Sequence, residues 1–319
     1  MSPVRDALRD YLGLRRSLGY QLKQQGQLLE DFVAFLERAG AERITTELAL
    51  CWAKQPQNVQ PYRWTERLGM VRCFARYLAT IDPDSEIPPK DLLPARKQRP
   101  APHIYSPAEI QALMDAAGSL SPALHAATYR TLIGLLAATG LRLGEALGLD
   151  RQDVDLKDGI LRVRGKNDKH REVPLHPTTV RALGDYARVR DRYWPQTSTP
   201  GFFITTTGTR LRVWSIHRTF RKLTRRAGLE SPAQRTPRGR GRRRALVRPH
   251  AFRHTYAVNT VLDWHRNGED VDSKLPLLST YLGHVKPEHT YWYLQAVPEL
   301  LAVVAQRLDG RLSISGGTS

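Results

Sequence analysis

Long apolar runs and cysteine are what this sequence most clearly lacks. It has no run of about 18 apolar residues, so no membrane-spanning helix is expected. The opening MSPVRDALRD has no apolar core of the kind that a secretion signal carries. The two cysteines, Cys51 and Cys73, show no metal-ligand spacing, and we expect them to be reduced thiols in a protein core. These absences predict a cytoplasmic protein.

Signatures of a metal site are missing as well. His250 and His254 lie four residues apart, but no glutamate completes an H-E-x-x-H motif and no cysteine is near them. A metal-dependent nuclease also needs clustered carboxylates, which the sequence does not offer. We therefore expect neither a metal nor a cofactor, and we rank a metal-dependent nuclease far below a metal-free mechanism.

Acidic residues are few relative to basic ones. Lysine and arginine number 49 against 31 aspartates and glutamates, which gives a formal charge of +18. Such an excess favours a polyanion as the partner, because neutralising phosphates releases condensed counterions. A generally adhesive basic protein, for example a ribosomal one, is the competing interpretation of the charge alone.

Apolar periodicity and proline content divide the 319 residues into two domains. Residues 1–81 read as helices, with stripes such as Val4, Leu8 and Leu12 at helical spacing. Residues 82–104 are rich in proline and have no periodicity, so we expect a linker there. The tetrapeptide SPAE at 106–109 is a capping box with proline at the first helical position, and it opens a second domain of residues 105–319.

The second domain combines helices with a small β-hairpin. Residues 127–138 are apolar nearly all round, which indicates a buried helix that ends at Gly140. Residues 160–164 and 171–175, joined by a polar GKND stretch, predict a hairpin, and residues 202–205 predict a further short strand. The predicted fold class is α+β, mainly helical, with a helical N-terminal domain and a mixed second domain that carries a small antiparallel hairpin.

Arginine is concentrated between residues 225 and 248. Nine arginines stand there against one acid, Glu230, with glycine and proline between them. Such a segment cannot bury a core, so we expect a loop that lies along a phosphate backbone, with a disordered insertion as the alternative. The candidate phosphate contacts in this loop and on the helix before it are Arg240, Arg242, Arg243, Arg244, Arg218 and Arg221.

Two arginines and a histidine offer groups that phosphodiester chemistry needs. A five-coordinate phosphorus carries negative charge on its non-bridging oxygens, and planar guanidinium donors suit these oxygens. Arg142 stands within the apolar run LLAATGLRLGEALGL, and His250 and Arg253 are one helical turn apart. Glu145 follows Arg142 by one turn and is placed to orient it, although a simple intrahelical ion pair explains the spacing equally well.

A lysine, a second histidine and a tyrosine complete the candidate set. Lys166 lies between the hairpin strands and suits protonation of a leaving oxygen, because the pKa of a lysine can be depressed. His284 follows a helix-ending glycine and should project from a helix end. Tyr293 is the candidate nucleophile, since cationic neighbours can stabilise a phenolate, and Tyr291 and Tyr281 compete for this role.

Six of these positions occur in an order that resembles the tyrosine recombinases, also called phage-type integrases: Arg142, Lys166, His250, Arg253, His284 and Tyr293. The matching stretches are ATGLRLGEALGL, GKNDKHREVPL, RPHAFRHTYA and LLSTYLGH, over residues 106–296. The N-terminal domain resembles the family's core-binding domain only in helical character and in its YLGLRRSLGY start. The TYWYL segment, without a separate arm-binding domain, is more similar to members borne by transposons or integrons.

The resemblance implies a site-specific recombinase that closes around double-stranded DNA as a C-shaped clamp. It implies that Tyr293 attacks a phosphate to give a 3′-phosphotyrosyl link and a free 5′-hydroxyl. A 5′-hydroxyl of a second strand then reverses the step without metal or ATP. The implied supporting roles are phosphate binding by Arg142, Arg253 and His250, assistance at the phosphate by His284, protonation of the leaving oxygen by Lys166, and support of the site by Glu145.

The resemblance also implies partners and leaves alternatives. It implies paired DNA recombination sites, a homotetramer and a nucleoid-associated, prokaryotic-type protein. The segment after Pro298 predicts an amphipathic helix that packs either on its own core or on a neighbouring protomer. Residues 225–248 and 267–276 are longer than the family pattern. A type IB topoisomerase and a DNA-binding relative that does not recombine are the competing functions.

Overall fold

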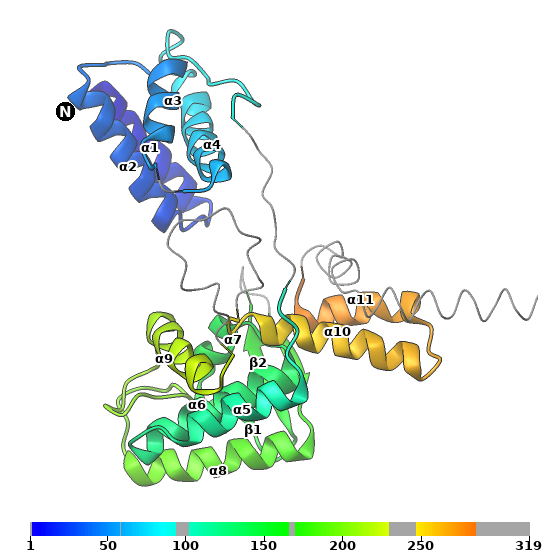
Figure 1. The fold of residues 1–319 in the computed structure, drawn as a ribbon. Helices are drawn as coiled ribbons and strands as arrows, with labels where there is room; N and C mark the ends of the chain where they lie inside the picture. Colours follow the sequence, from blue (N-terminus) through cyan, green and yellow to red (C-terminus); the bar gives the residue numbers. More distant parts are fainter. Residues whose placement is uncertain (1, 58, 94–101, 166–169, 230–246, 285–319) are drawn as a thin grey trace, which may run out of the picture. The chain divides into compact units, whose positions relative to one another are not determined.

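The computed structural model describes residues 2–57, 59–93, 102–165, 170–229 and 247–284 (Figure 1). The chain separates into two units, residues 1–99 and 100–319, and the division lies within the proline-rich segment 82–104. Among the described helices, none is long and apolar enough to cross a membrane.

In its described residues the first unit is a bundle of four helices: α1 (Pro3–Ser17), α2 (Lys23–Arg38), α3 (Thr46–Lys54) and α4 (Pro61–Leu78). The side chains of Ser2 and Thr45 cap α1 and α3 by accepting backbone N–H groups. The apolar stripes face inward, over a core in which Phe32, Trp52 and Phe74 are completely buried.

Both cysteines lie on the outside of this bundle, so the expectation of core thiols was wrong. Cys51 on α3 and Cys73 on α4 are free and exposed. Each stands next to a buried aromatic residue, Trp52 and Phe74 respectively. Because neighbouring residues on a helix point about 100° apart, a position beside a core residue can face solvent.

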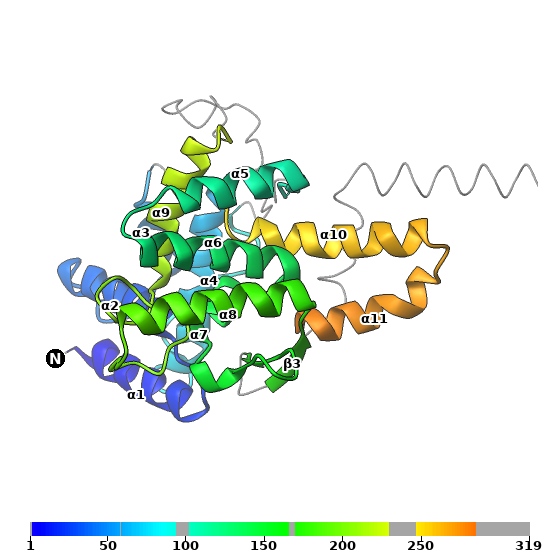
Figure 2. The same cartoon turned by 90° about the horizontal axis from the view of Figure 1, so that it is seen from below.

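The described part of the second unit contains the following elements in chain order: α5 (Pro107–Gly118), α6 (Ala123–Thr139), α7 (Leu143–Gly148), the 3₁₀ turn η1 (Arg151–Asp153), β1 (Val154–Asp155), β2 (Ile160–Arg164), β3 (His170–Pro174), α8 (Pro177–Tyr193), α9 (Val213–Arg226), α10 (Ala251–Arg266) and α11 (Val271–Leu282). The capping box at Ser106 and Glu109 starts α5 as predicted. Helix α6 lies between α5 and α8 (Figures 1 and 2), which explains its nearly uniform apolar surface.

The sheet is antiparallel, in the order β1-β2-β3. In the predicted hairpin, Arg164 at the end of β2 pairs with His170 at the start of β3. The prediction of a short strand at residues 202–205 was wrong. There the described backbone forms only isolated bridges, Asp150 with Gly201 and Ile204 with Arg210. The fold class is confirmed: the second unit is mainly helical with a small antiparallel sheet.

Helices α10 and α11 lie side by side and share their own apolar cluster, which includes Val258, Val261 and Leu278 (Figure 2). The start of α10 is joined to the rest of the unit by Tyr105. The Tyr105 backbone N–H donates to Thr255 Oγ1 at 2.9 Å, and its ring stacks on Phe252 with centroids 4.4 Å apart. Arg253 in the first turn of α10 donates to the carbonyl of Leu282, so the start of α10 lies beside the end of α11.

Candidate active site

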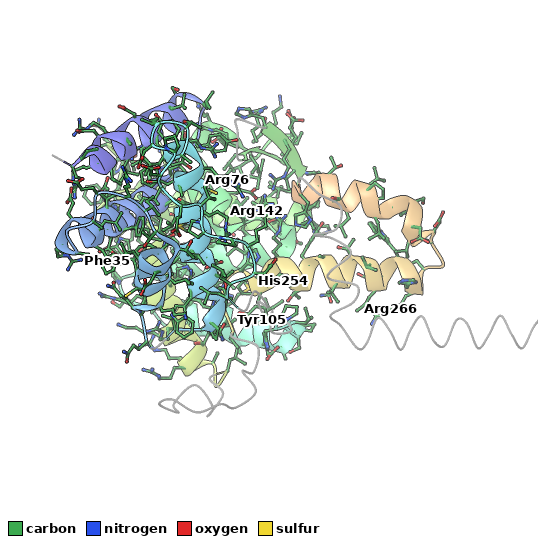
Figure 3. All side chains as sticks on the ribbon, turned by 90° about the horizontal axis from the view of Figure 1, so that it is seen from above. Phe35, Arg76, Tyr105, Arg142, His254 and Arg266 are labelled. Atoms are coloured by element: carbon green, nitrogen blue, oxygen red, sulfur yellow. The ribbon has the colours of Figure 1, made fainter. Side chains whose placement is uncertain are left out.

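Three segments that are distant in sequence meet at the end of α11: the turn between α6 and α7, the start of α10, and the hairpin strand β3. In Figure 3, His254 is labelled near the start of α10 and Arg266 at its other end, and the label of Arg142 lies near that of His254. Each segment contributes an arginine to the meeting point.

The turn after α6 depends on Gly140. Its φ of +61° lies in the left-handed region that disfavours any residue with a Cβ. A Cβ built there would also stand 2.8 Å from a ring carbon of Tyr256 on α10. Glycine therefore ends α6 and lets α10 approach, and the chain turns so that Arg142 precedes the first residue of α7.

Glu145 holds Arg142 in two ways. Its Oε2 accepts the backbone N–H of Arg142 at 3.0 Å, and its Oε1 accepts from the Arg142 Nη1 at 2.7 Å. The Glu145 side chain is 7% exposed, while that of Arg142 is 35% exposed. A buried carboxylate thus fixes a guanidinium that still reaches the surface.

Arg253 is almost completely buried, with 1% of its surface exposed. Its Nη1 donates to the carbonyl of Gly140 at 3.0 Å, and its Nη2 donates to the carbonyl of Leu282. It therefore joins the end of α6 to the end of α11. Arg142 donates through Nη2 to the next carbonyl, that of Gly283, at 2.8 Å. The two predicted arginines are consequently neighbours, because they bind consecutive residues.

The glycine before His284 ends α11 as predicted. Gly283 has φ +65°, and the backbone N–H of His284 returns to the carbonyl of Ser279 at 2.9 Å. Because Arg142 binds the Gly283 carbonyl, His284 follows directly from the residue that holds the arginine. The structure thus places His284 next in the chain to the residue that Arg142 contacts.

His250 immediately precedes α10, one turn before Arg253. Burial lowers the pKa of His250, and the charges of Arg253 and Arg142 lower it further. Burial likewise lowers the pKa of His254 to about 3, with His250 and Arg253 as further causes. Both imidazoles are accordingly neutral at pH 7, so each can donate through one ring nitrogen and accept through the other.

Arg171 on β3 is the residue that sequence reasoning missed. Its Nη2 and Nη1 donate to the two carboxylate oxygens of Glu145 at 2.8 and 3.2 Å, and its Nε donates to the carbonyl of Tyr281 at 2.8 Å. One signal was available: Arg171 and the buried Val173 are two apart on a strand and share a face. A charged residue on the buried face of a strand needs a partner.

Tyr281 is a poor competitor for the nucleophile. Its ring stacks on that of Tyr256 with centroids 5.4 Å apart. Burial raises its pKa well above the ordinary value, and Tyr256 raises it further. Burial stabilises the neutral phenol, so Tyr281 is less suited than an exposed tyrosine to supply the phenolate that the attack requires.

Of the predicted site residues, the structure brings together Arg142, Glu145, His250, Arg253 and His284. Lys166, Tyr291 and Tyr293 lie outside the described residues, as do Arg240, Arg242, Arg243 and Arg244. The described histidines, cysteines and carboxylates form no group of three or more that could hold a metal ion.

Known proteins resemble this chain in sequence and in fold. The profile of the Phage integrase family matches residues 104–299. A putative integrase/recombinase, y4rB of Sinorhizobium fredii (strain NBRC 101917 / NGR234), is 43% identical over 98% of each chain. The tyrosine recombinase XerC of Chlamydia caviae (strain ATCC VR-813 / DSM 19441 / 03DC25 / GPIC) is 29% identical over 90% of this chain and 92% of its own.

Two solved structures share the fold at low sequence identity. The Tn1549 transposon integrase in complex with transposon right end DNA has a TM-score of 0.65 at 16% identity, over 97% of this chain and all of its own. A lambda integrase tetramer bound to a Holliday junction has a TM-score of 0.61 at 16% identity, over 91% of this chain and 76% of its own.

Proposed function

The chain belongs to the phage integrase family of tyrosine recombinases, and from that premise we propose that the site at the end of α11 binds one DNA phosphate for attack by Tyr293. Enzymes of this family cleave and rejoin DNA strands, and this chain is such a site-specific recombinase. The type IB topoisomerase alternative is not favoured. The residue roles below are the proposal.

One observation supports these roles most directly: Arg142 and Arg253 bind the consecutive carbonyls of Gly283 and Leu282, with His250 close to both. These hydrogen bonds to the protein hold both guanidinium groups in place. A preorganised cationic site of this kind stabilises the charge that develops on the non-bridging oxygens of a phosphate. His284, which follows Gly283, completes the set.

The chemistry exchanges one phosphodiester for another. The Tyr293 oxygen forms a bond to phosphorus while the bond from phosphorus to the 5′ oxygen breaks, and Lys166 gives its proton to that oxygen. The phenolic proton leaves to a base. The product is a 3′-phosphotyrosyl link and a 5′-hydroxyl, and attack by the 5′-hydroxyl of another strand reverses every step. Because the number of phosphoester bonds is unchanged, no ATP is needed.

The proposal is tested by trapping the covalent intermediate. The protein is incubated with supercoiled plasmid that carries the DNA flanking its gene, in EDTA, and quenched with detergent. We expect a protein–DNA adduct at a 3′ end, with a yield that EDTA does not reduce. When complexes are sized without the detergent quench, we expect four protomers on each pair of sites. Loss of the adduct in EDTA, or attachment at a 5′ end, would contradict the proposal. Relaxation of any plasmid by single protomers would favour the topoisomerase alternative.

Helix α9 supplies the DNA contacts that can be argued from described residues. It buries Ile216, Phe220 and Leu223 and turns Arg218 and Arg221 to solvent. Exposed arginines on one face of an amphipathic helix suit a phosphate backbone. The same role is proposed for the arginines of residues 240–244.

Replacing both Arg218 and Arg221 with glutamine should flatten the salt dependence of DNA binding. Each lost phosphate contact reduces the slope of log K against log salt by about 0.9. Binding is measured by fluorescence anisotropy between low and moderate salt. Arg188→Gln is the control, because Arg188 is an exposed arginine on α8 that is paired with Asp185. A double variant with the same slope as Arg188→Gln would remove α9 from the interface.

The finer statements on assembly and location are also proposals. The structure of lambda integrase is a tetramer bound to a Holliday junction, which supports a homotetramer on paired DNA sites for this chain. The predicted C-terminal helix after Pro298 lies outside the described residues. The bacterial relatives support action at a bacterial nucleoid.

A further inference from the structure

The last two residues of α11 and the glycine that caps it are each held by a different arginine. Arg171 donates to the carbonyl of Tyr281, Arg253 to that of Leu282 and Arg142 to that of Gly283. These three contacts are called the arginine clamp below. The final carbonyls of a helix have no partners within it and carry partial negative charge, so cationic donors satisfy them well.

The three arginines come from three elements and differ in exposure. Arg253 on α10 is buried and Arg142 before α7 is about one-third exposed, while the Arg171 side chain on β3 is 15% exposed. The Arg171 guanidinium also donates to both carboxylate oxygens of Glu145. Glu145 in turn binds the guanidinium and the backbone of Arg142. A closed ring of contacts therefore joins β3, α7 and the end of α11.

We propose that Arg171 is a positioning residue for the recombination reaction: it fixes Glu145, and through it Arg142, and it fixes the end of α11 from which His284 follows. The proposal rests on the proposed function of this site. Arg171 does not touch the phosphate in this scheme. It acts because a planar fork with three separate donor positions can hold a carboxylate and a carbonyl at the same time.

The space around Gly283 supports this tight arrangement. A Cβ at Gly283 would stand 3.0 Å from Arg171 Nη1 and 3.6 Å from Arg142 Nη1. The two guanidinium groups are therefore packed against the same backbone residue, and Glu145 lies between their charges. Without Arg171, Glu145 would keep one cationic partner only, and the α11 terminus would lose one of its three ties.

Strand β3 also connects Arg171 to the hairpin that carries Lys166. Arg171 pairs across the sheet with Val163, one residue from the end of β2 at Arg164. The hairpin strands are thus tied to the α11 terminus through Arg171.

The first test compares Arg171→Gln and Arg171→Lys with Arg162→Gln, which removes an exposed arginine of the same sheet that pairs with Asp155 and Glu172. Adduct formation is timed on a nicked DNA substrate, and DNA affinity is measured in parallel. We expect Arg171→Gln to slow adduct formation by about 100-fold, because small misplacements of reacting groups have effects of this size. Affinity should stay within about threefold, since Arg171 makes no phosphate contact.

Arg171→Lys should be intermediate, because a single ammonium cannot replace three donors. Arg162→Gln should match the unmodified protein. If Arg171→Gln forms adduct as fast as Arg162→Gln, or if rate and affinity fall by equal factors, the positioning role is wrong.

The pH profile separates positioning from a purely structural effect. Burial raises the pKa of Glu145, but the hydrogen bonds and charge of Arg171, followed by the hydrogen bonds from Arg142, outweigh it and leave the pKa below its ordinary value. Removing Arg171 should therefore shift the acid limb of the rate profile to higher pH. His250, just before α10, is present in every variant, so its titration is common to all of them. The pKa of Tyr281 on α11 is raised, away from the acid limb. A shift of the acid limb between variants therefore reports on Glu145. An unmoved acid limb would count against the link through Glu145.

Two further measurements complete the test. In a double-mutant cycle, Glu145→Gln added to Arg171→Gln should slow the reaction less than the product of the two single effects.

Without DNA, the amides of Gly283 and His284, which bond to the carbonyls of Thr280 and Ser279, should exchange hydrogen about tenfold faster in Arg171→Gln than in Arg162→Gln. Equal exchange rates in these two variants would contradict the role of Arg171 in the arginine clamp, even if the unmodified protein forms no adduct. Absence of an adduct from the unmodified protein would instead refute the proposed function.

Discussion

Replacing Tyr293 with phenylalanine is expected to abolish the covalent protein–DNA adduct while leaving DNA binding nearly intact. The change removes one oxygen and no charge, so the contacts to phosphates are kept. Loss of an essential nucleophile lowers a rate by more than roughly 10⁴-fold in comparable covalent mechanisms. The measurement is the yield of detergent-stable adduct per bound protein, with binding followed by gel shift.

Tyr291→Phe is the matched control, because Tyr291 is two residues away and carries the same phenol. It should form adduct at close to the normal rate. An adduct that survives in Tyr293→Phe and disappears in Tyr291→Phe would move the nucleophile to residue 291. Tyr281 is the least suited of the three tyrosines, since its ring is stacked on Tyr256 and burial raises its pKa.

Arg253→Lys is expected to lower both the stability of the protein and the rate of cleavage. Lysine keeps the charge but cannot reach the carbonyls of Gly140 and Leu282 together, so one buried acceptor loses its partner. That loss costs about 2 kcal/mol of unfolding free energy. Loss of one oriented donor at the phosphate should slow cleavage by about 100-fold or more. Denaturant unfolding and single-turnover adduct formation measure the two effects.

Arg190→Lys separates these two effects. Arg190 on α8 is also buried, at 2% exposed, and donates to the carbonyl of Phe202 and to Asp191, but it is not part of the site. It should lose similar stability and cleave DNA at the normal rate per folded molecule. If both lysine variants cleave equally well, Arg253 supports the fold and not the reaction.

The arrangement is consistent with the proposed role of a buried arginine, Arg253, at a phosphate. Arg253 and Arg142 are fixed on consecutive carbonyls at the negative end of a helix, which lowers the cost of gathering like charges. Glu145 contributes the compensating charge between Arg142 and Arg171. The described part of the proposed site is therefore held together by protein contacts, and its geometry depends on where α11 ends.

The sequence by itself determined the features that depend on near neighbours along the chain. The capping box at Ser106, the helix-ending glycines Gly140 and Gly283, the presence of the hairpin and the one-turn spacing of His250 and Arg253 are local. Caps, left-handed glycines and residues one helical turn apart are fixed by backbone geometry over a few residues, so their patterns can be read directly. The order of the motifs also identified the family.

Only the tertiary structure decided which distant groups meet. Arg171 reaches Glu145 across 26 positions and Tyr281 across 110, and Arg142 reaches Gly283 across 141. Whether Cys51 faces solvent, or Tyr281 is stacked on Tyr256, likewise depends on which face of a helix is covered by another element. Such contacts arise from the packing of whole elements, which no local pattern encodes. For that reason the sequence placed Arg171 in the hairpin, and the packed structure showed that it holds the end of α11.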